Sequence, residues 1–313
     1  MCAAGVDRNR IRLLLEVSRM YWEEGVDQEE VARRTGYSRS TVSRLLAQAR
    51  RTGVVTVRVS HPVERLTEIE DRLVSAYGLR AVRVTEQAGD QLGAQAAELL
   101  LEHCRPTSVI AVSNGREVGS VVRSLPQRSW PRSLVVQMLG LVGQSSGLED
   151  GPDICRDMAM RLGGSHQALP VPLVFDTVQA ADAMRREEQV VITLELAARS
   201  DVALTGVGAV ERGAVSPILR RWMTPELLEQ CARAGAVAHI CGHHIDARGA
   251  HVPTPLCRRT VCLEPDRLRE VPLVIGVAHG WHKVEAIRAV LRGGYLSGLV
   301  TDEATAAAVL GDR

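Results

Sequence analysis

Hydrophobic residues recur at helical spacing along the first fifty positions of the chain. Between residues 8 and 24 they fall three or four positions apart, which predicts an amphipathic helix that ends at Gly25. The face expected to be buried comprises Ile11, Leu14, Leu15, Ser18 and Tyr21. A small helical unit is therefore expected near the N-terminus.

Two further short helices, joined by a tight turn, are predicted between residues 28 and 52. Gly36 can adopt the left-handed conformation that the turn requires, Ser38 is placed to cap the second helix, and Gly53 to end it. Residues expected at the crossing and in the core of the helices are Ala32, Val42 and Leu45. Residues 54–59 alternate as a strand does and predict a short wing. The pattern is typical of an all-α winged helix-turn-helix, which we assign to residues 1–59.

Residues 60–78 predict a connecting helix. Pro62 marks its start, and Leu66, Ile69 and Leu73 recur at helical spacing. This apolar stripe fits two roles equally well. It could pair two subunits, as a protein that binds two DNA half-sites needs, or it could pack against the C-terminal domain of the same chain.

From Leu79 onward, short apolar runs alternate with helical patterns, which predicts a large, doubly wound, mostly parallel α/β domain over residues 79–313. The expected strands are Ala81–Val84, Val109–Ser113, Leu134–Leu139, Val202–Thr205, Ala236–Cys241, Leu273–Ala278 and Leu299–Thr301. Helices are expected to begin at Thr224, which precedes a proline, and at Asp302.

Several expected strands end in glycine-containing loops. In open α/β sheets, ligands bind beyond the carboxyl ends of the strands, where glycine lets backbone N–H groups approach an anion. The loop residues are Ser113, Asn114, Gly115, Arg116, Gly140, Gly206, Gly208 and Gly280. Because four such loops are expected at one edge of the sheet, we predict a shared ligand pocket.

Although the net charge of the chain is only +1, positive charge is concentrated in one segment. No acid occurs between residues 31 and 59, and the arginines of this segment are Arg33, Arg34, Arg39, Arg44, Arg50, Arg51 and Arg58. A concentrated basic strip suits DNA, because the release of counterions from phosphates supplies much of the binding free energy.

The predicted second helix of the helix-turn-helix would enter the major groove with its N-terminal residues at the base edges. Arg50 and Arg51, further along, are expected at phosphates. The complete set of residues predicted to bind DNA is Gln28, Ser38, Arg39, Ser40, Thr41, Ser43, Arg44, Arg50 and Arg51.

Lys283 is the single lysine among 38 basic residues, all others being arginine. A chain so biased towards arginine is expected to retain a lysine where a compact ammonium group is needed, as in binding a phosphate or carboxylate. We therefore place Lys283 in the predicted ligand pocket.

The seven cysteines are scattered and never spaced as Cys-x-x-Cys, which favours reduced thiols over a disulfide framework. No secretion signal and no run of about 18 apolar residues is found, so membrane insertion is not expected. The sequence therefore predicts a cytoplasmic protein.

The chain resembles the SorC (sorbitol-operon regulator) family of bacterial transcription regulators. The N-terminal segments that carry this resemblance are Tyr21-Trp-Glu-Glu-Gly, Gln28-Glu-Glu-Val-Ala, Tyr37-Ser-Arg-Ser-Thr-Val-Ser-Arg-Leu-Leu and Ala49-Arg-Arg-Thr-Gly-Val-Val. The C-terminal segments are Ile110-Ala-Val-Ser-Asn-Gly-Arg, Ile240-Cys-Gly-His-His-Ile-Asp-Ala-Arg-Gly, Val274-Ile-Gly-Val-Ala-His-Gly-Trp-His-Lys and Leu299-Val-Thr-Asp-Glu-Ala-Thr-Ala. The resemblance thus covers essentially the whole chain.

The resemblance implies a C-terminal effector domain of the fold shared with sugar-phosphate isomerases and deaminases, which binds a sugar, a polyol or a sugar phosphate. It also implies a double-stranded DNA operator as partner and assembly into dimers or tetramers. By position, it adds Asp246 to the effector residues named above. No catalytic residue, cofactor or metal is expected.

The chain departs from the family pattern at four positions. The family commonly has Trp at Asn114, Thr at Glu117, Asp at His239 and Gly at His279. An acid and a histidine in an anion-binding pocket favour a sugar-like ligand without a doubly charged phosphate.

Two alternative functions remain open. Histidines and cysteines gather late in the chain, at His239, Cys241, His243, His244, His251, Cys257, Cys262, His279 and His282. These side chains suit zinc, copper or nickel, so a metal-responsive regulator is one alternative. A sugar-phosphate enzyme fused to a DNA-binding module is the other, although the sequence shows no paired carboxylates or nucleophile with a base.

Overall fold

The computed structural model of the chain describes residues 8–55, 62–143, 150–210 and 218–311. The chain divides into two compact units, Met1–His61 and Pro62–Arg313. Within the described ranges, no helix is both long enough and apolar enough to cross a membrane.

The first unit is helical. Its elements are α1 (Arg8–Trp22), α2 (Gln28–Thr35) and α3 (Arg39–Arg51). Gly36 ends α2 with a φ of 73°, and the Ser38 hydroxyl caps α3 by accepting a hydrogen bond from the Thr41 backbone N–H at 3.2 Å. Both roles were expected from the sequence, and together they set the tight turn between α2 and α3.

A compact core holds these three helices together. Its buried residues are Leu14, Val17, Val31, Val42, Leu45, Leu46 and Ala49. Leu15, expected in this core, is 38% exposed, and Val17 is buried instead. Residues 56–59 of the expected wing lie outside the described residues.

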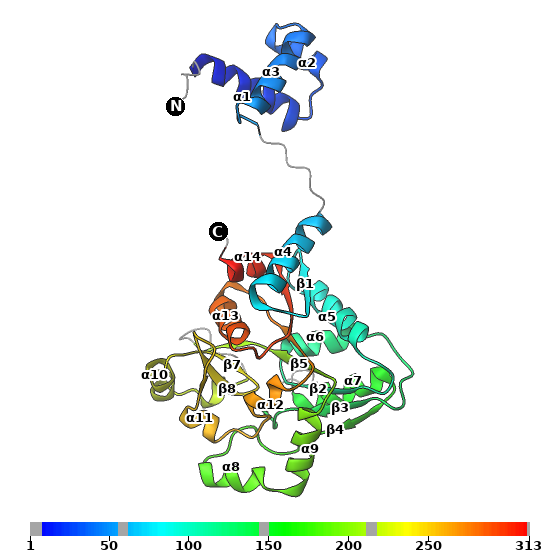
Figure 1. The fold of residues 1–313 in the computed structure, drawn as a ribbon, viewed down its shortest axis with the longest axis vertical. Helices are drawn as coiled ribbons and strands as arrows, with labels where there is room; N and C mark the ends of the chain where they lie inside the picture. The colour runs from blue at the N-terminus through cyan, green and yellow to red at the C-terminus, as the bar shows by residue number, and fades with distance from the viewer. Residues whose placement is uncertain (1–7, 56–61, 144–149, 211–217, 312–313) are drawn as a thin grey trace. The chain divides into compact units, whose positions relative to one another are not determined.

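The second unit combines two sheets with many helices (Figure 1). Its helices are α4 (Pro62–Tyr77), α5 (Asp90–His103), α6 (Arg116–Ser124), α7 (Gly151–Leu162), α8 (Val178–Arg185), α9 (Glu188–Ala198), η1 (Arg220–Trp222), α10 (Pro225–Arg233), α11 (Pro255–Arg258), α12 (Pro265–Arg269), η2 (Trp281–Lys283), α13 (Val284–Arg292) and α14 (Glu303–Leu310). Its strands are β1 (Ala81–Thr85), β2 (Val109–Val112), β3 (Leu134–Gln137), β4 (Ser165–Gln167), β5 (Val202–Gly206), β6 (Gly208–Ala209), β7 (Ala236–Ile240), β8 (His243–Asp246), β9 (His251–Val252), β10 (Leu273–Val277) and β11 (Gly298–Asp302).

The larger sheet has seven strands, all parallel, in the order β1-β11-β10-β5-β2-β3-β4. Alternate residues of each strand face opposite cores. In β2, for example, Ile110 packs with α5, α6 and α7, whereas Ala111 packs on the side of α4, α9, α13 and α14. This two-sided burial explains why the sequence shows these strands as continuous apolar runs.

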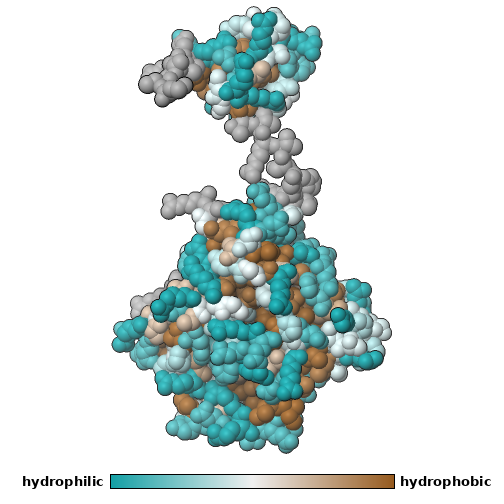
Figure 2. All heavy atoms as spheres, viewed as in Figure 1, coloured by the Kyte–Doolittle hydropathy of each residue, from teal (hydrophilic) through white to brown (hydrophobic). Residues whose placement is uncertain are grey.

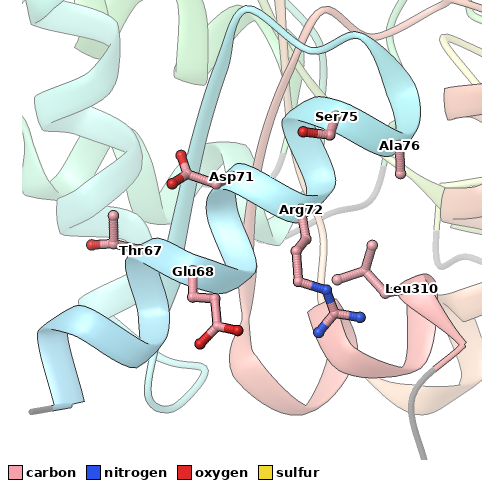
Figure 3. Close-up of a pocket in the computed structure, with 7 residues that line it drawn as sticks. All are labelled: Thr67, Glu68, Asp71, Arg72, Ser75, Ala76 and Leu310. Carbon is pink, nitrogen blue, oxygen red and sulfur yellow. The ribbon is translucent and has the colours of Figure 1, made fainter. Parts of the chain in front are cut away.

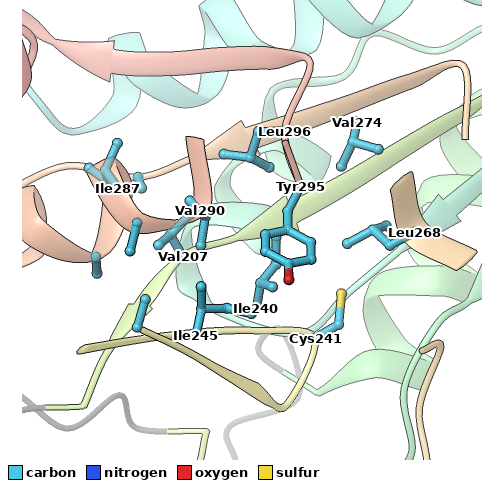
Figure 4. Close-up of a cluster of buried hydrophobic side chains, with 14 of the residues drawn as sticks. Val207, Ile240, Cys241, Ile245, Leu268, Val274, Ile287, Val290, Tyr295 and Leu296 are labelled. Carbon is cyan, nitrogen blue, oxygen red and sulfur yellow. The ribbon is translucent and has the colours of Figure 1, made fainter. Parts of the chain in front are cut away.

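The smaller sheet is antiparallel, in the order β6-β7-β8-β9. The strand expected at Ala236–Cys241 belongs to it as β7 and not to the parallel sheet. Figure 4 shows the core in which Ile240 and Ile245 of this sheet face Ile287 and Val290 of α13. The apolar residues of β7 are buried in this core, just as those of the parallel strands are buried in theirs. Hydrophobicity alone therefore could not decide to which sheet the strand belongs.

Helix α4 packs against β1 and α14 of its own unit. Leu73 is fully buried there, and the Tyr77 hydroxyl donates a hydrogen bond to the Val309 carbonyl at 3.3 Å. The guanidinium of Arg288, on α13, donates to the same carbonyl at 3.0 Å. The C-terminal end of α14 is therefore tied to both α4 and α13.

Candidate functional site

The predicted base-contacting residues lie on the exposed face of α3. Arg39, Ser40, Ser43 and Arg44 are all exposed. Thr41 is half-buried, and its hydroxyl lies 2.8 Å from the Ser38 hydroxyl. The Ser40 hydroxyl also lies 3.0 Å from that of Ser38, so three of the predicted polar side chains take part in the cap. Arg39, Ser43 and Arg44 are exposed and lie outside this group.

Ion pairs separate the arginines of the basic strip into two groups. Arg33 and Arg34 pair with Glu30 on their own helix, so their charges are partly neutralised. Arg39, Arg44 and Arg51 form no ion pair with another residue that the structure describes.

The remaining polar residues of the predicted interface lie in the last turn of α3 and at the start of α2. The guanidinium carbon of Arg50 lies 4.7 Å from the centre of the Trp22 ring, which orients this side chain. Gln28, at the start of α2, is half-buried. Hydrophilic side chains dominate the face of this unit that Figure 2 shows.

The glycine loops follow four neighbouring strands of the parallel sheet. Gly280 follows β10, Gly206 ends β5, Gly115 follows β2 and Gly140 follows β3, and these strands are adjacent in the sheet. From β2 the chain proceeds to β3 and β4, whereas from β5 it proceeds in the opposite direction to β10 and β11. The boundary between β2 and β5 is thus the topological switch point, where ligands bind in open α/β sheets.

Two buried polar residues line the loop after β2. Ser113 donates its backbone N–H to the Leu204 carbonyl of β5 at 3.0 Å, which joins the two strands at the switch point. The amide of Asn114 donates to the Gly140 carbonyl at 3.4 Å, while its Oδ1 has no hydrogen-bond partner among the described residues. A buried carbonyl oxygen without a donor is costly, so Asn114 is suited to accept a hydrogen bond from a ligand.

Lys283 donates a hydrogen bond to the carboxylate of Glu117 at 2.6 Å. The two residues are 166 positions apart, and both side chains are largely buried, with exposed fractions of 13% and 17%. Burial raises the pKa of Glu117, but Lys283 and, further, His279 lower it by more, so the pKa lies below its ordinary value. The single lysine therefore has an anionic partner within the protein.

Further basic side chains lie near this pair. Arg116 is exposed at the start of α6. Burial, Lys283 and His279 each lower the pKa of His282, as expected for an imidazole in a positively charged neighbourhood. The loops after β2 and β10 thus form one cluster, in which the carboxylate of Glu117 lies next to Lys283.

His239 lies beside the glycine loop after β5, although it was not among the effector residues predicted from the sequence. Its ring packs directly on Gly208, its partner in the β6–β7 pairing, and neither ring nitrogen has a hydrogen-bond partner among the described residues. Burial, followed by His244 and Lys283, lowers its pKa to about 3. At neutral pH, His239 therefore offers one N–H donor and one nitrogen acceptor. The sequence singled out this position as a departure from the family pattern and as one of the histidines gathered late in the chain.

Asp246 is not brought to the glycine loops. It pairs with Ala236 at the other end of β7, and its carboxylate accepts hydrogen bonds from the backbone N–H groups of Arg248 and Ala250 at 2.9 and 2.8 Å. Three strand positions separate it from His239 along the ladder, roughly 10 Å. Its carboxylate organises the turn between β8 and β9.

The contact between Gly208 and His239 gives a test of this geometry. A Cβ atom at Gly208 would lie 1.9 Å from the His239 ring, so Gly208→Ala is expected to lower the free energy of unfolding by about 1–3 kcal/mol. Adding His239→Ala removes the ring and should restore part of that loss. Urea unfolding measures both effects.

Gly206→Ala is the matched control, because the nearest atom to a Cβ there is the Val277 carbonyl oxygen at 4.0 Å. It should change stability little. If Gly206→Ala and Gly208→Ala are equally destabilising, or if His239→Ala gives no rescue, the described packing of His239 on Gly208 is incorrect.

A shallow groove lies elsewhere on the second unit, between α4 and α14 (Figure 3). Its lining residues are Thr67, Glu68, Asp71, Arg72, Ser75, Ala76 and Leu310. None of the glycine loops contributes to this groove, so the backbone N–H groups of the switch point do not line it. We do not place the effector there.

Comparison with protein families identifies both units. The Sugar-bind family of sugar-binding domains matches residues 61–311, and the MarR family matches residues 4–65. The first match covers the glycine loops, and the second covers α2 and α3.

Whole-length relatives are named as regulators. The chain is 31% identical over 314 residues to the transcriptional regulator LsrR of Klebsiella pneumoniae, covering 98% of this chain and 95% of that protein. It is 30% identical over 297 residues to LsrR of Escherichia coli K12, covering 93% and 92%. These relatives are transcriptional regulators and not enzymes.

A solved structure extends the likeness to the whole fold. The full-length sorbitol operon regulator SorC of Klebsiella pneumoniae superposes with a TM-score of 0.75 at 27% identity, covering 98% of this chain and 100% of that one. The structural likeness therefore covers both units of this chain. The chain belongs to the SorC family of transcriptional regulators, in which a helix-turn-helix is joined to a sugar-binding domain.

Proposed function

We propose that this regulator binds an uncharged sugar or polyol at the switch point of its parallel sheet, and that this binding changes its affinity for operator DNA. The observation that carries the proposal is the Lys283–Glu117 pair, set among glycine loops on four neighbouring strands. The pair offers a donor and an acceptor side by side, and hydroxyl groups can use both.

The surrounding groups suit the same ligand class. The bare Oδ1 of Asn114 and the neutral ring of His239 supply further polar contacts. The backbone and side chains of the loops would complete the pocket, and its proposed residues are Ser113, Asn114, Gly115, Arg116, Gly140, Gly206, Gly208, His239, Gly280 and Lys283. Few charged and many neutral hydrogen-bonding groups are the expected environment of a polyhydroxylated ligand.

The carboxylate of Glu117 argues against a phosphate at Lys283. A phosphate there would have to displace Glu117 from the ammonium or lie beside its negative charge, and like charges in a partly buried site repel strongly. A hydroxyl group meets no such penalty. We therefore propose that the part of the effector nearest Lys283 is not phosphorylated.

We propose that α3 binds in the major groove, with Arg39, Ser40, Ser43 and Arg44 at base edges. Arg50 and Arg51, with Gln28 and Ser38, would contact phosphates. Two recognition helices are needed for two half-sites, so the proposed active form is a homo-oligomer. The effector can act as a switch only if it binds one arrangement of the oligomer more tightly than another.

Thermal unfolding of the full-length protein with a panel of sugars and polyols, each beside its phosphorylated form, tests the effector class. A ligand that binds only the folded state raises the unfolding temperature, and at 100 times its Kd it contributes about 2.7 kcal/mol. We expect stabilisation by an unphosphorylated member of the panel. The same ligand should change binding to operator DNA in a fluorescence anisotropy assay.

Asn114→Ala is the matched variant, since it removes a bare polar group without removing a charge. It should weaken the effector response and leave DNA binding unchanged. Stronger stabilisation by a phosphorylated form would contradict the proposal that the effector is uncharged. An unchanged effector response in Asn114→Ala would mean that the effector does not bind at the switch point.

A further inference from the structure

A second cluster of polar side chains lies in the small antiparallel sheet, outside the proposed effector site. His243 of β8, His251 of β9 and Cys257 of α11 each offer one ligand atom, and these atoms all lie within 4.8 Å of one another. We propose that these three residues bind a zinc-class divalent metal ion. The proposal is independent of the effector site.

Neighbouring elements hold the three residues in place. The pairing of Ile245 with His251 brings β9 beside β8, and the Thr254 hydroxyl caps α11 by accepting the Cys257 backbone N–H at 3.4 Å. His243 and Cys257 are only 2% and 4% exposed, whereas His251 is half-buried. A metal ion can therefore enter from the His251 side and reach two ligands fixed in the interior.

The two imidazoles each present a bare nitrogen. His243 Nδ1 and His251 Nε2 are buried and have no hydrogen-bond partner among the described residues. Their rings are 4.9 Å apart and nearly perpendicular. Buried polar atoms without partners are rare and call for an explanation such as a missing ion. Two of them, on residues that converge on a thiol, indicate a common ligand.

The other nitrogen of His243 has the surroundings of a metal-bound histidine. Its Nε2 lies 3.1 Å from the Cys262 sulfur and 3.7 Å from the Glu264 carboxylate. An ionised carboxylate only accepts hydrogen bonds, so it favours the tautomer with the proton on Nε2 and the lone pair on Nδ1. Outer groups of this kind orient the histidines of metal sites.

The sulfur of Cys257 receives hydrogen bonds suited to a thiolate. The His244 backbone N–H donates to it at 3.3 Å and the Thr254 hydroxyl at 3.2 Å. In the thiol form, its S–H can donate to the Val252 carbonyl at 3.5 Å. Metal binding would form a sulfur–metal bond and release this proton to solvent.

The donor set selects the class of metal. Two imidazoles and one thiolate suit zinc, whereas calcium and magnesium require oxygen ligands. Zinc binds nitrogen at about 2.0–2.1 Å and sulfur at about 2.3 Å, so the ligand atoms need to close by roughly an ångström. Three protein ligands leave the fourth tetrahedral position to water.

Cobalt(II) titration of the full-length protein, purified without a histidine tag and stripped with a chelator, tests the site. We expect one ion per chain, with thiolate-to-cobalt charge-transfer absorption, visible bands of a four-coordinate ion and displacement by zinc. Loss of an outer-shell partner alone lowers metal affinity roughly 10–100-fold, so Cys257→Ser and His251→Ala should each lower it at least about 100-fold. Cys257→Ser should also abolish the charge-transfer band.

Cys104→Ser and His166→Ala are the matched controls, since both residues lie outside the cluster and should leave binding unchanged. Circular dichroism checks that each variant is folded. If Cys257→Ser does not fold, His251→Ala decides, because His251 is half-buried on a two-residue strand. Less than one ion per chain, full binding by His251→Ala, or equal losses in the controls would overturn the proposal.

Discussion

Replacing Arg39 and Arg44 together by alanine is expected to lower operator affinity about 100-fold or more without lowering the unfolding temperature. Each good arginine contact with a base contributes about 1–3 kcal/mol of discrimination, and both side chains are exposed and free of ion pairs with other described residues. Fluorescence anisotropy with an operator selected from random duplexes measures the loss. Effector binding should be unchanged.

Arg199→Ala is the charge control, because its side chain, at the C-cap of α9, is 79% exposed and its loss removes one positive charge, against two in the double variant. The salt dependence separates the two possible kinds of contact. Loss of a base contact relaxes sequence preference, whereas loss of a phosphate contact mainly lowers the slope of log K against log salt by about one. Equal losses for Arg199→Ala and the double variant would refute the assignment of α3.

Lys283→Met is expected to abolish stabilisation by the effector and to lower the free energy of unfolding by about 2 kcal/mol. It leaves Glu117 charged, largely buried and without its partner. Removing one member of a fully buried pair costs roughly 3–5 kcal/mol, and the residual exposure of this pair reduces that figure. Adding Glu117→Gln removes the stranded charge and should restore stability but not effector binding. Urea unfolding and the thermal shift assay measure the two effects separately.

The pH dependence follows from the direction of the Glu117 pKa. In the wild type this pKa is lowered, so the pair contributes stability above the unfolded pKa of about 4.3 and loses it as the pH falls through the folded value. In Lys283→Met, burial alone should raise the pKa of Glu117. In the variant, the carboxylate of Glu117 should then become protonated at a higher pH than in the wild type. The difference in free energy of unfolding between the variant and the wild type should therefore become smaller in acid. A deficit that does not change with pH, or an intact effector response, would contradict the role given to Lys283.

Local sequence chemistry predicts the first unit in detail. Gly36 and Ser38 act within a few residues of their own positions, so their roles follow from backbone geometry and capping alone. Leu15 was misplaced because three- and four-residue steps define a wide stripe. Only packing decides which edge of that stripe is buried.

Six of the seven parallel strands were predictable for a different reason. Strands buried on both faces are continuous apolar runs, and all seven expected runs are strands in the structure. The short strands β4, β6, β8 and β9 were missed. β8, which is His-His-Ile-Asp, has no apolar run because its histidines carry polar contacts of their own.

The candidate site was only partly predictable. Glycines at strand ends indicate the edge of the sheet, and the rarity of lysine singled out Lys283. Its ion pair with Glu117 joins two residues that are 166 positions apart in the sequence, and it depends on the order of the strands in the sheet. Asp246 shows the converse, because the acid expected by resemblance to be at the effector serves a turn.

Helix α14 is anchored at both ends by other elements of the second unit. At its start, the Gly280 backbone N–H donates to the Thr305 hydroxyl at 2.8 Å, and that hydroxyl donates to Asp302 at 2.7 Å. At its end, the Val309 carbonyl of α14 accepts a hydrogen bond from the Tyr77 hydroxyl of α4, the first helix of the second unit. A ligand that displaces the Gly280 loop would therefore act on the start of α14, and the contacts at the end of this helix would pass the displacement to α4 and α13.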